Sequence, residues 1–223
     1  MRLIFKKEII ANPVAIFGGG AWIEDTKDWP RIPFSERYMT HLMSIFSNIM
    51  GDSFDSNYCI SVFISYELDK DGYPKVSLSD KYVVHTQDDL TKFKEEGFTK
   101  VIITKKRISS IKEKFSEHVL PTIYIDKRNF TKEENDSYDE EFENSGMGID
   151  GSTLLTNPYF EQDVIKFPMS EDILLQIDEW DLVDIYPELK GIFQTGLGYL
   201  FLNKNYKKKK NGEIIGDFFI QHT

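Results

Sequence analysis

Two glycine-rich segments, each followed by a proline, recur along the chain and constrain its fold more than any other feature. Three residue pairs share one constant spacing: Gly18 with Gly146, Gly20 with Gly148, and Pro30 with Pro158. Glycine and proline clusters break helices, so both segments are expected to be turns. Each segment precedes an apolar run (residues 41–46 and 173–178) and then a strand-like run (residues 60–66 and 198–204). Such a repeat predicts two structurally similar halves.

The chain is long enough and apolar enough for one domain with a substantial core, at 223 residues and 40% hydrophobic residues. We therefore expect a single domain over residues 1–223. Its repeated halves would span residues 1–130 and 144–223, and an acidic linker over residues 131–143 would join them.

Residues 36–50 show the spacing of an amphipathic helix. Their apolar side chains recur three, four and seven positions apart: Met39, Leu42, Met43, Phe46, Ile49 and Met50. Ser35 precedes this stripe and belongs to the residue types that cap helix N-termini. The periodicity therefore favours a helix over these residues.

Other segments complete the predicted fold class. Residues 58–68 are rich in β-branched and aromatic side chains, which predicts a strand. Residues 86–97 are typical of a helix that Thr86 caps and Gly97 ends. Residues 170–180 fit a strand or a helix by pattern alone. Because helices and strands mix without strict alternation, we expect the α+β class, with mixed or antiparallel sheets and flanking helices.

The charge balance restricts the partners. The chain has 37 acidic and 27 basic residues, a net charge of −10. Nucleic-acid surfaces need clustered cations, so direct nucleic-acid binding is not expected. No apolar run is long enough to span a bilayer and no secretion signal is recognisable, so we expect a cytoplasmic protein without membrane contact. Cys59 is the only cysteine, and its apolar surroundings predict a buried, inert thiol.

Gly146, Gly148 and Gly151 match the G-x-G-x-x-G pattern of dinucleotide-binding loops, and Glu171 stands where an acidic residue would contact a ribose. That pattern functions only between a strand and a helix. Here an acidic stretch precedes the glycines, and Pro158 would interrupt a following helix. We therefore interpret the segment as a turn whose glycines adopt positive φ angles, and we expect no cofactor.

Catalytic and metal-binding patterns are missing from the sequence as well. The four histidines lack the spacing to one another, to cysteine or to carboxylates that zinc sites require: His41, His85, His118 and His222. The G-x-S-x-G motif of serine hydrolases does not occur. The sequence therefore predicts that the protein is not an enzyme and holds no metal.

Two acidic clusters that contain aromatic residues form the candidate partner-binding site. The first cluster is Glu133, Glu134, Asp136, Tyr138, Asp139, Glu140, Glu141 and Phe142. The second cluster is Asp178, Glu179, Trp180, Asp181, Asp184 and Tyr186. Carboxylates with embedded aromatics suit an interface with a basic partner. The alternatives are a solvated loop or helix for the first cluster and core positions for Trp180 and Tyr186.

The opening segment resembles the first block of the YwqG-like family, a group of bacterial proteins of unknown function. The matching positions are Gly19, Gly20, Trp22, Trp29, Pro30, Met39, Thr40, Leu42 and Ile45. A second block is similar to residues 174–178, 196–202 and 216–221, whereas Ala21, His41 and Ser44 depart from the family pattern. The resemblance implies an α+β fold with repeated halves and no established catalytic residues. It also implies a strand where the periodicity of residues 36–50 favours a helix.

Members of that family recur beside secreted bacterial toxins, so the resemblance implies an immunity role. Together with the acidic clusters, it predicts a non-enzymatic cytoplasmic immunity protein that binds and occludes a cognate, basic toxin. Carboxylates would steer the association and aromatic side chains would fill pockets on the toxin. The alternative is a small-molecule-binding or enzymatic α+β protein with a cleft between its halves.

Overall fold

Strand-forming sequence dominates the molecule, and β5 (Tyr58–Ile64) shows why. Its β-branched and aromatic side chains are buried from Cys59 to Ile64, which confirms the predicted strand. The computed structural model describes residues 1–24, 26–50, 54–111, 119–166 and 169–222. Strands make up 34% of the described structure and helices 23%.

The strands and helices of the described residues have the following bounds. The other strands are β1 (Arg2–Lys6), β2 (Ala15–Phe17), β3 (Ala21–Ile23), β4 (Thr40–Ile45), β6 (Thr99–Ile111), β7 (Ile123–Arg128), β8 (Thr153–Leu154), β9 (Glu171–Asp178), β10 (Leu197–Asn203) and β11 (Ile214–Gln221). The α-helices are α1 (Ser47–Met50), α2 (Val76–Ser79), α3 (Gln87–Glu96), α4 (Lys132–Ser145) and α5 (Glu179–Val183). Short 3-10 helices are η1 (Thr26–Asp28), η2 (Asp80–Tyr82), η3 (Pro187–Leu189) and η4 (Tyr206–Lys208).

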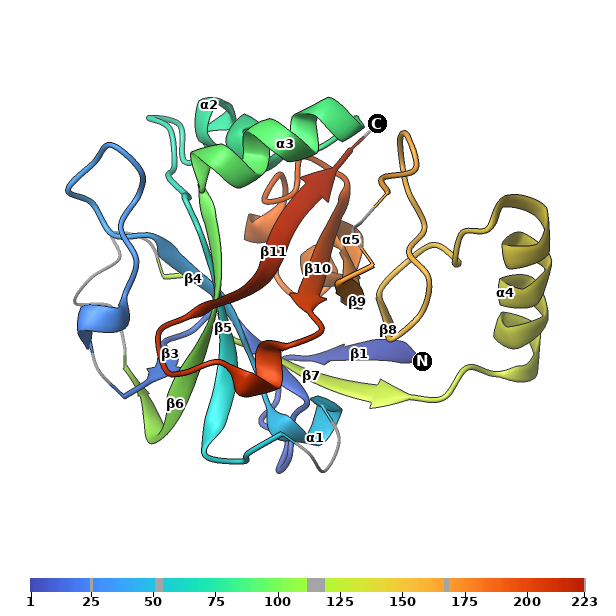
Figure 1. Ribbon diagram of the computed structural model, residues 1–223, viewed down its shortest axis with the longest axis horizontal. Helices are drawn as coiled ribbons and strands as arrows, with labels where there is room; N and C mark the ends of the chain where they lie inside the picture. Colours follow the sequence, from blue (N-terminus) through green and yellow to red (C-terminus); the bar gives the residue numbers. More distant parts are fainter. Residues whose placement is uncertain (25, 51–53, 112–118, 167–168, 223) are drawn as a thin grey trace.

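Ten of these strands form a closed antiparallel β-barrel (Figure 1). Their order is β11-β10-β9-β8-β1-β7-β2-β4-β5-β6, and β6 closes the barrel by pairing with β11 through Ile102 and Ile214. β3 pairs with the far part of β6. The fold is therefore mainly β, and the predicted α+β class with mixed sheets is wrong.

The helix predicted over residues 36–50 is also wrong, because β4 occupies its centre. All six residues of β4 are buried, polar His41 and Ser44 included. A strand with both faces buried reads as a near-continuous apolar run, which contains helical spacings by coincidence. Ser35 caps no α-helix; its hydroxyl accepts a hydrogen bond from the backbone N–H of Arg37 (3.1 Å). The strand agrees with the implication of the family resemblance at this position.

Two meanders of four strands make up most of the barrel. One is β2-β4-β5-β6 and the other is β8-β9-β10-β11. The apolar runs paired in the sequence take equivalent places in them, β4 with β9 and β5 with β10. β1 and β7 pair with each other between the two meanders. β1 precedes the first meander in the chain but pairs with β8 of the second, and β7 precedes the second meander but pairs with β2 of the first. The division of the chain into two repeated halves stays a prediction.

Helices cover only parts of the barrel. α3 begins and ends as predicted, with a Thr86–Asp89 capping box and Gly97 at φ 68°, and its Phe93 packs on Phe219 of β11 (ring centroids 6.0 Å apart). α4, formed by the segment predicted as the acidic linker, stands beside the barrel rather than across it (Figure 1). Of the helices in the part of the chain that the structure describes, none is long and apolar enough to cross a bilayer.

Candidate partner-binding surface

α4 folds without a buried face. Its N-terminus is a capping box in which Thr131 accepts from the N–H of Glu134, and Glu134 accepts from the N–H of Thr131 (2.7 Å). Gly146 ends the helix at φ 75°, and its N–H donates to the carbonyl of Phe142 (2.9 Å). None of its residues is buried. Glu134, Tyr138 and Glu141 are half-buried at helical spacing on one face, and the rest of the helix surface is exposed to solvent.

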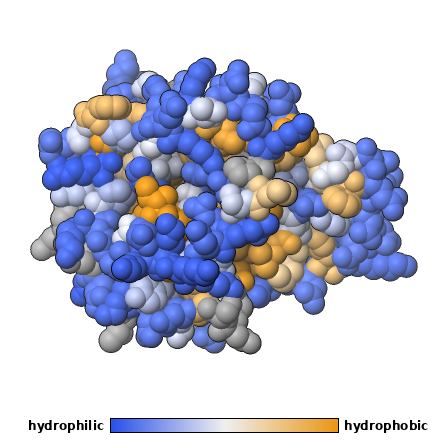
Figure 2. Space-filling view, in the orientation of Figure 1, coloured by the Kyte–Doolittle hydropathy of each residue, from blue (hydrophilic) through white to orange (hydrophobic). Residues whose placement is uncertain are grey.

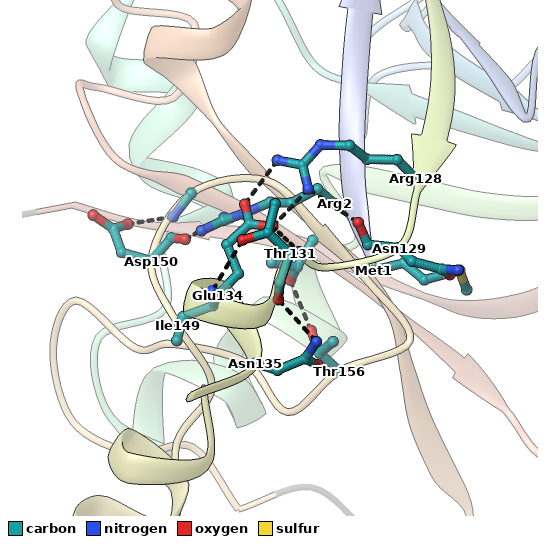
Figure 3. Close-up of polar contacts among 12 residues, drawn as sticks. Met1, Arg2, Arg128, Asn129, Thr131, Glu134, Asn135, Ile149, Asp150 and Thr156 are labelled. Carbon is teal, nitrogen blue, oxygen red and sulfur yellow. Dashed lines mark hydrogen bonds and ion pairs between the residues drawn. The ribbon is translucent and has the colours of Figure 1, made fainter. Parts of the chain in front are cut away.

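Glu134 fastens this helix to the barrel (Figure 3). Arg128 on β7 donates two hydrogen bonds to the Glu134 carboxylate (2.5 and 2.8 Å), and Arg2 on β1 donates a third through Nε (3.0 Å). Arg2 and Arg128 are opposite partners in the β1–β7 pair. The Arg128 hydrogen bonds, with support from Thr131 and Arg2, lower the pKa of Glu134 to about 2. Two guanidinium groups thus neutralise Glu134 within the chain.

The remaining carboxylates of α4 carry the charge of its surface. Glu133, Asp136, Asp139, Glu140 and Glu143 are exposed, and Glu141 is half-buried. The helix contains a single lysine, Lys132, and its last turn has no basic residue. Like charges on one helix repel one another, and negative charge near a helix C-terminus opposes the helix dipole. A basic partner would relieve both effects.

Aromatic side chains accompany these carboxylates. Tyr138 and Phe142 stack on one side of α4, with ring centroids 6.2 Å apart, and Phe142 is 46% exposed. A groove of about 560 Å³ lies next to Tyr138, and its apolar lining is Leu155, Phe160, Ile165, Ile173 and Phe201. Figure 2 shows apolar surface between the barrel and the hydrophilic lobe at the position of α4. An apolar centre beside a charged rim is the usual composition of a protein interface.

The second predicted cluster surrounds α5, and its members have different roles. Asp178 caps the helix by accepting from the N–H of Trp180 (2.9 Å), and the Trp180 side chain is 50% exposed. Glu179 is fully buried, and its carboxylate accepts from the N–H groups of residues 191, 193 and 195 (2.7, 2.6 and 3.0 Å). Glu179 therefore organises the 191–195 loop and has no surface to offer a partner, contrary to its predicted role.

Asp150 links the two clusters. It lines a groove of about 390 Å³ with Glu140 and Glu141 of α4, and also a groove of about 600 Å³ with Asp181 and Asp184 beside α5. The second groove is lined as well by Arg2 and Arg128, the two guanidinium groups that pair with Glu134. We call the exposed carboxylates of α4 together with Asp150, Glu161, Asp178, Asp181 and Asp184 the acidic face.

The charges of the acidic face act on one another. Burial raises the pKa of Asp178 to about 6, and the carboxylates of Asp181, Asp150 and Glu161 add to the rise. Burial and the charge of Asp150 raise the pKa of Glu161 as well. Sequence reasoning missed both residues. Asp150 lies inside the glycine segment, which the sequence indicates to be a turn rather than part of a binding surface, whereas Glu161 carries no sequence signal.

The structure therefore separates the predicted site residues into two groups. Those open to a partner are Glu133, Asp136, Asp139, Glu140, Phe142, Trp180 and Asp184, with Tyr138, Glu141, Asp178 and Asp181 half-buried. Engaged within the chain are Glu134, Glu179 and Tyr186. The Nζ atom of Lys7 lies 4.6 Å from the ring centroid of Tyr186. Arg2 and Arg128, which position α4, were not anticipated.

The glycine segment forms the corner between α4 and β8. Gly146 and Gly151 have φ angles of 75° and 80°, which confirms the turn predicted for them. A Cβ atom on Gly148 would lie 1.8 Å from the carbonyl oxygen of Asn157, so any other residue there would displace the backbone. Nη1 of Arg2 donates to the carbonyl of Asp150 at this corner (2.5 Å). The backbone conformation and close packing of this corner explain why glycine occupies these positions.

Among the described histidines and the cysteine, His41 and Cys59 are buried. His41 is buried beside Ser44 (Nε2 to Oγ 2.9 Å), and burial lowers its pKa to about 4. The rings of His85 and His222 lie 4.6 Å apart, and His118 is outside the described residues. Cys59 is buried as predicted, and burial raises the pKa of its thiol. Across the described ranges no three His, Cys, Asp or Glu side chains group closely enough to hold a metal ion.

Comparison with known proteins leaves the surface to be interpreted from its own geometry. No protein-family model matches the chain, and a search of curated proteins finds no significant match. The resemblance to the YwqG-like family therefore stays a prediction.

Proposed function

We propose that this protein is a non-enzymatic binding protein whose acidic face engages a basic surface on a partner protein. The observation that carries the proposal is α4, a helix with seven carboxylates, one lysine and no buried residue. Core packing does not explain such a helix, yet Glu134 fixes it firmly to β1 and β7. A charged helix that is already formed and anchored at its first turn loses less conformational entropy on binding than an unfolded segment would.

The partner we propose is a toxin that acts in the cytoplasm, in line with the YwqG-like resemblance. Binding would occlude the toxin. The carboxylates of the acidic face would steer the encounter, and Phe142 and Trp180 would occupy pockets on the toxin. Because Glu134 and Glu179 are engaged inside the chain, they would support this surface without touching the partner.

Co-expression with the product of the neighbouring gene tests the proposal. We expect that product to stop growth when expressed alone and this protein to restore growth, with the two proteins copurifying. A neighbouring product that is harmless alone, or that kills regardless of this protein, would contradict the immunity role. Thermal shifts caused by a panel of small molecules, without protein binding, would favour the alternative of a small-molecule-binding protein.

A further inference from the structure

A second, unrelated site lies on the outside of the first meander. Ile16, Phe46 and Cys59 form a small cluster there, separate from the main core, and Trp22 and Tyr124 pack against it. Over this cluster is a pocket of about 440 Å³. That volume is within the range of pockets that bind small molecules.

The matching outer face of the second meander shows what ordinarily fills such a space. There Phe160 packs on Tyr199 (ring centroids 5.5 Å apart), and Phe93 of α3 packs on Phe219. Both meanders thus present apolar side chains outward. On the second meander, Phe160 from the β8–β9 connection and α3 from the β5–β6 connection cover these side chains. On the first meander, the described residues leave a pocket.

The walls of the pocket are held in place by polar contacts. Nδ2 of Asn48 in α1 donates to the carbonyls of Asn12 and Pro13 (3.3 and 3.0 Å), which fixes the loop before β2 along one side. Trp22 and Phe46 meet edge to face, with ring centroids 5.7 Å apart and planes at 88°. An apolar wall fixed before binding favours a planar, apolar ligand.

Lys106 is the cation among the described lining residues of this pocket. The Nζ atom of Lys106 lies 4.7 Å from the ring centroid of Phe46 and 6.0 Å from that of Trp22. Its neighbour Lys105 pairs with Glu24 (3.1 Å), but Lys106 forms no ion pair with any described residue. No acidic side chain is among the described residues of the lining, although the chain as a whole is acidic. The site therefore favours an anion with an apolar body.

We propose that this pocket binds a small aromatic carboxylate. The ring system lies against Trp22, Phe46 and Ile16, and the carboxylate pairs with Nζ of Lys106. Among the described lining residues, one lysine provides for one anionic group, which favours a monoanion as the ligand class. The pocket shares no lining residue with the grooves of the acidic face. The proposal is therefore independent of partner binding.

Titration calorimetry with a matched pair of probes tests it: 2-naphthoate and the uncharged 2-naphthamide, which have the same ring system. We expect the carboxylate to bind at least about tenfold more tightly than the amide. Lys106→Met keeps a long, exposed apolar chain and should remove that difference. Lys105→Met, at the adjacent position, should retain it.

Three results would overturn the proposal: no binding of 2-naphthoate at millimolar concentration, equal affinities for the acid and the amide, or an unchanged affinity in Lys106→Met. Lys106 is exposed, so its replacement is not expected to unfold the protein, and a thermal melt of both variants checks this. Binding to the partner protein should be the same for both lysine variants.

Discussion

At the scale of single residues, Glu179 shows that a charged side chain typical of a binding surface can instead have a buried structural role. Its carboxylate receives three backbone N–H groups in a fully buried site. In Glu179→Gln the side chain keeps one oxygen that can accept these hydrogen bonds, but its NH2 group faces a backbone N–H, and two donors cannot bond to each other. We expect the free energy of unfolding to fall by about 2 kcal/mol, and by more in Glu179→Ala, measured by urea denaturation. Equal stability of Glu179→Gln and the parent would contradict the buried role.

Asp178 provides a pH-dependent test of the acidic face. Its pKa rises to about 6 in the folded protein, mainly through burial, so folding favours the protonated form. The protonation of Asp178 therefore contributes fully to the free energy of unfolding below about pH 4, and this contribution is lost as the pH rises through about 6.

Asp178→Asn mimics the protonated acid and keeps a good helix cap. We expect it to be more stable than the parent at pH 7.5, by on the order of 1 kcal/mol after allowance for partial exposure, and equal to it near pH 4. Denaturant melts at the two pH values measure the difference. A variant that is less stable at pH 7.5 would show that the charged form is the favoured one.

At the scale of secondary-structure elements, α4 is held by its anchor rather than by burial. Glu134→Gln removes the charge that binds Arg2 and Arg128. Because no residue of α4 is buried, we expect hydrogen exchange over residues 132–145 to accelerate at least about tenfold while the global free energy of unfolding changes by less than about 1 kcal/mol. Asp136→Asn, at an exposed position of the same helix, is the control and should leave exchange nearly unchanged. Equal exchange in the two variants would remove the anchor role from Glu134.

Elements were predictable from sequence where local signals decide the structure. Thr86 and Gly97 mark the ends of α3 correctly, because capping is settled by residues within one turn. Residues 36–50 were mispredicted because β4 is buried on both of its faces, and this burial comes from tertiary packing that local periodicity does not report. Residues 170–180 fitted both patterns and contain both elements, since β9 ends where α5 begins.

At the scale of the whole molecule, closure of the barrel could not be read from the sequence. Closure depends on the pairing of β6 with β11, of β1 with β8 and of β7 with β2. These pairings join residues far apart in the chain. The acidic clusters were recognisable as composition. The sequence did not indicate that the two clusters form one face. Asp150 and Glu161 lie between α4 and α5 only once the chain has folded.

The central claim is that the carboxylates of α4 bind a basic partner, and the association rate of the partner identified by co-expression tests it most directly. Asp136→Lys with Glu143→Lys reverses two exposed charges on α4. Asp88→Lys with Glu95→Lys reverses two exposed charges at the same spacing on α3. At low ionic strength we expect the α4 variant to associate at least about tenfold more slowly and the α3 variant to associate like the parent, with the difference shrinking as salt is added. Equal rates for the two variants would contradict the claim.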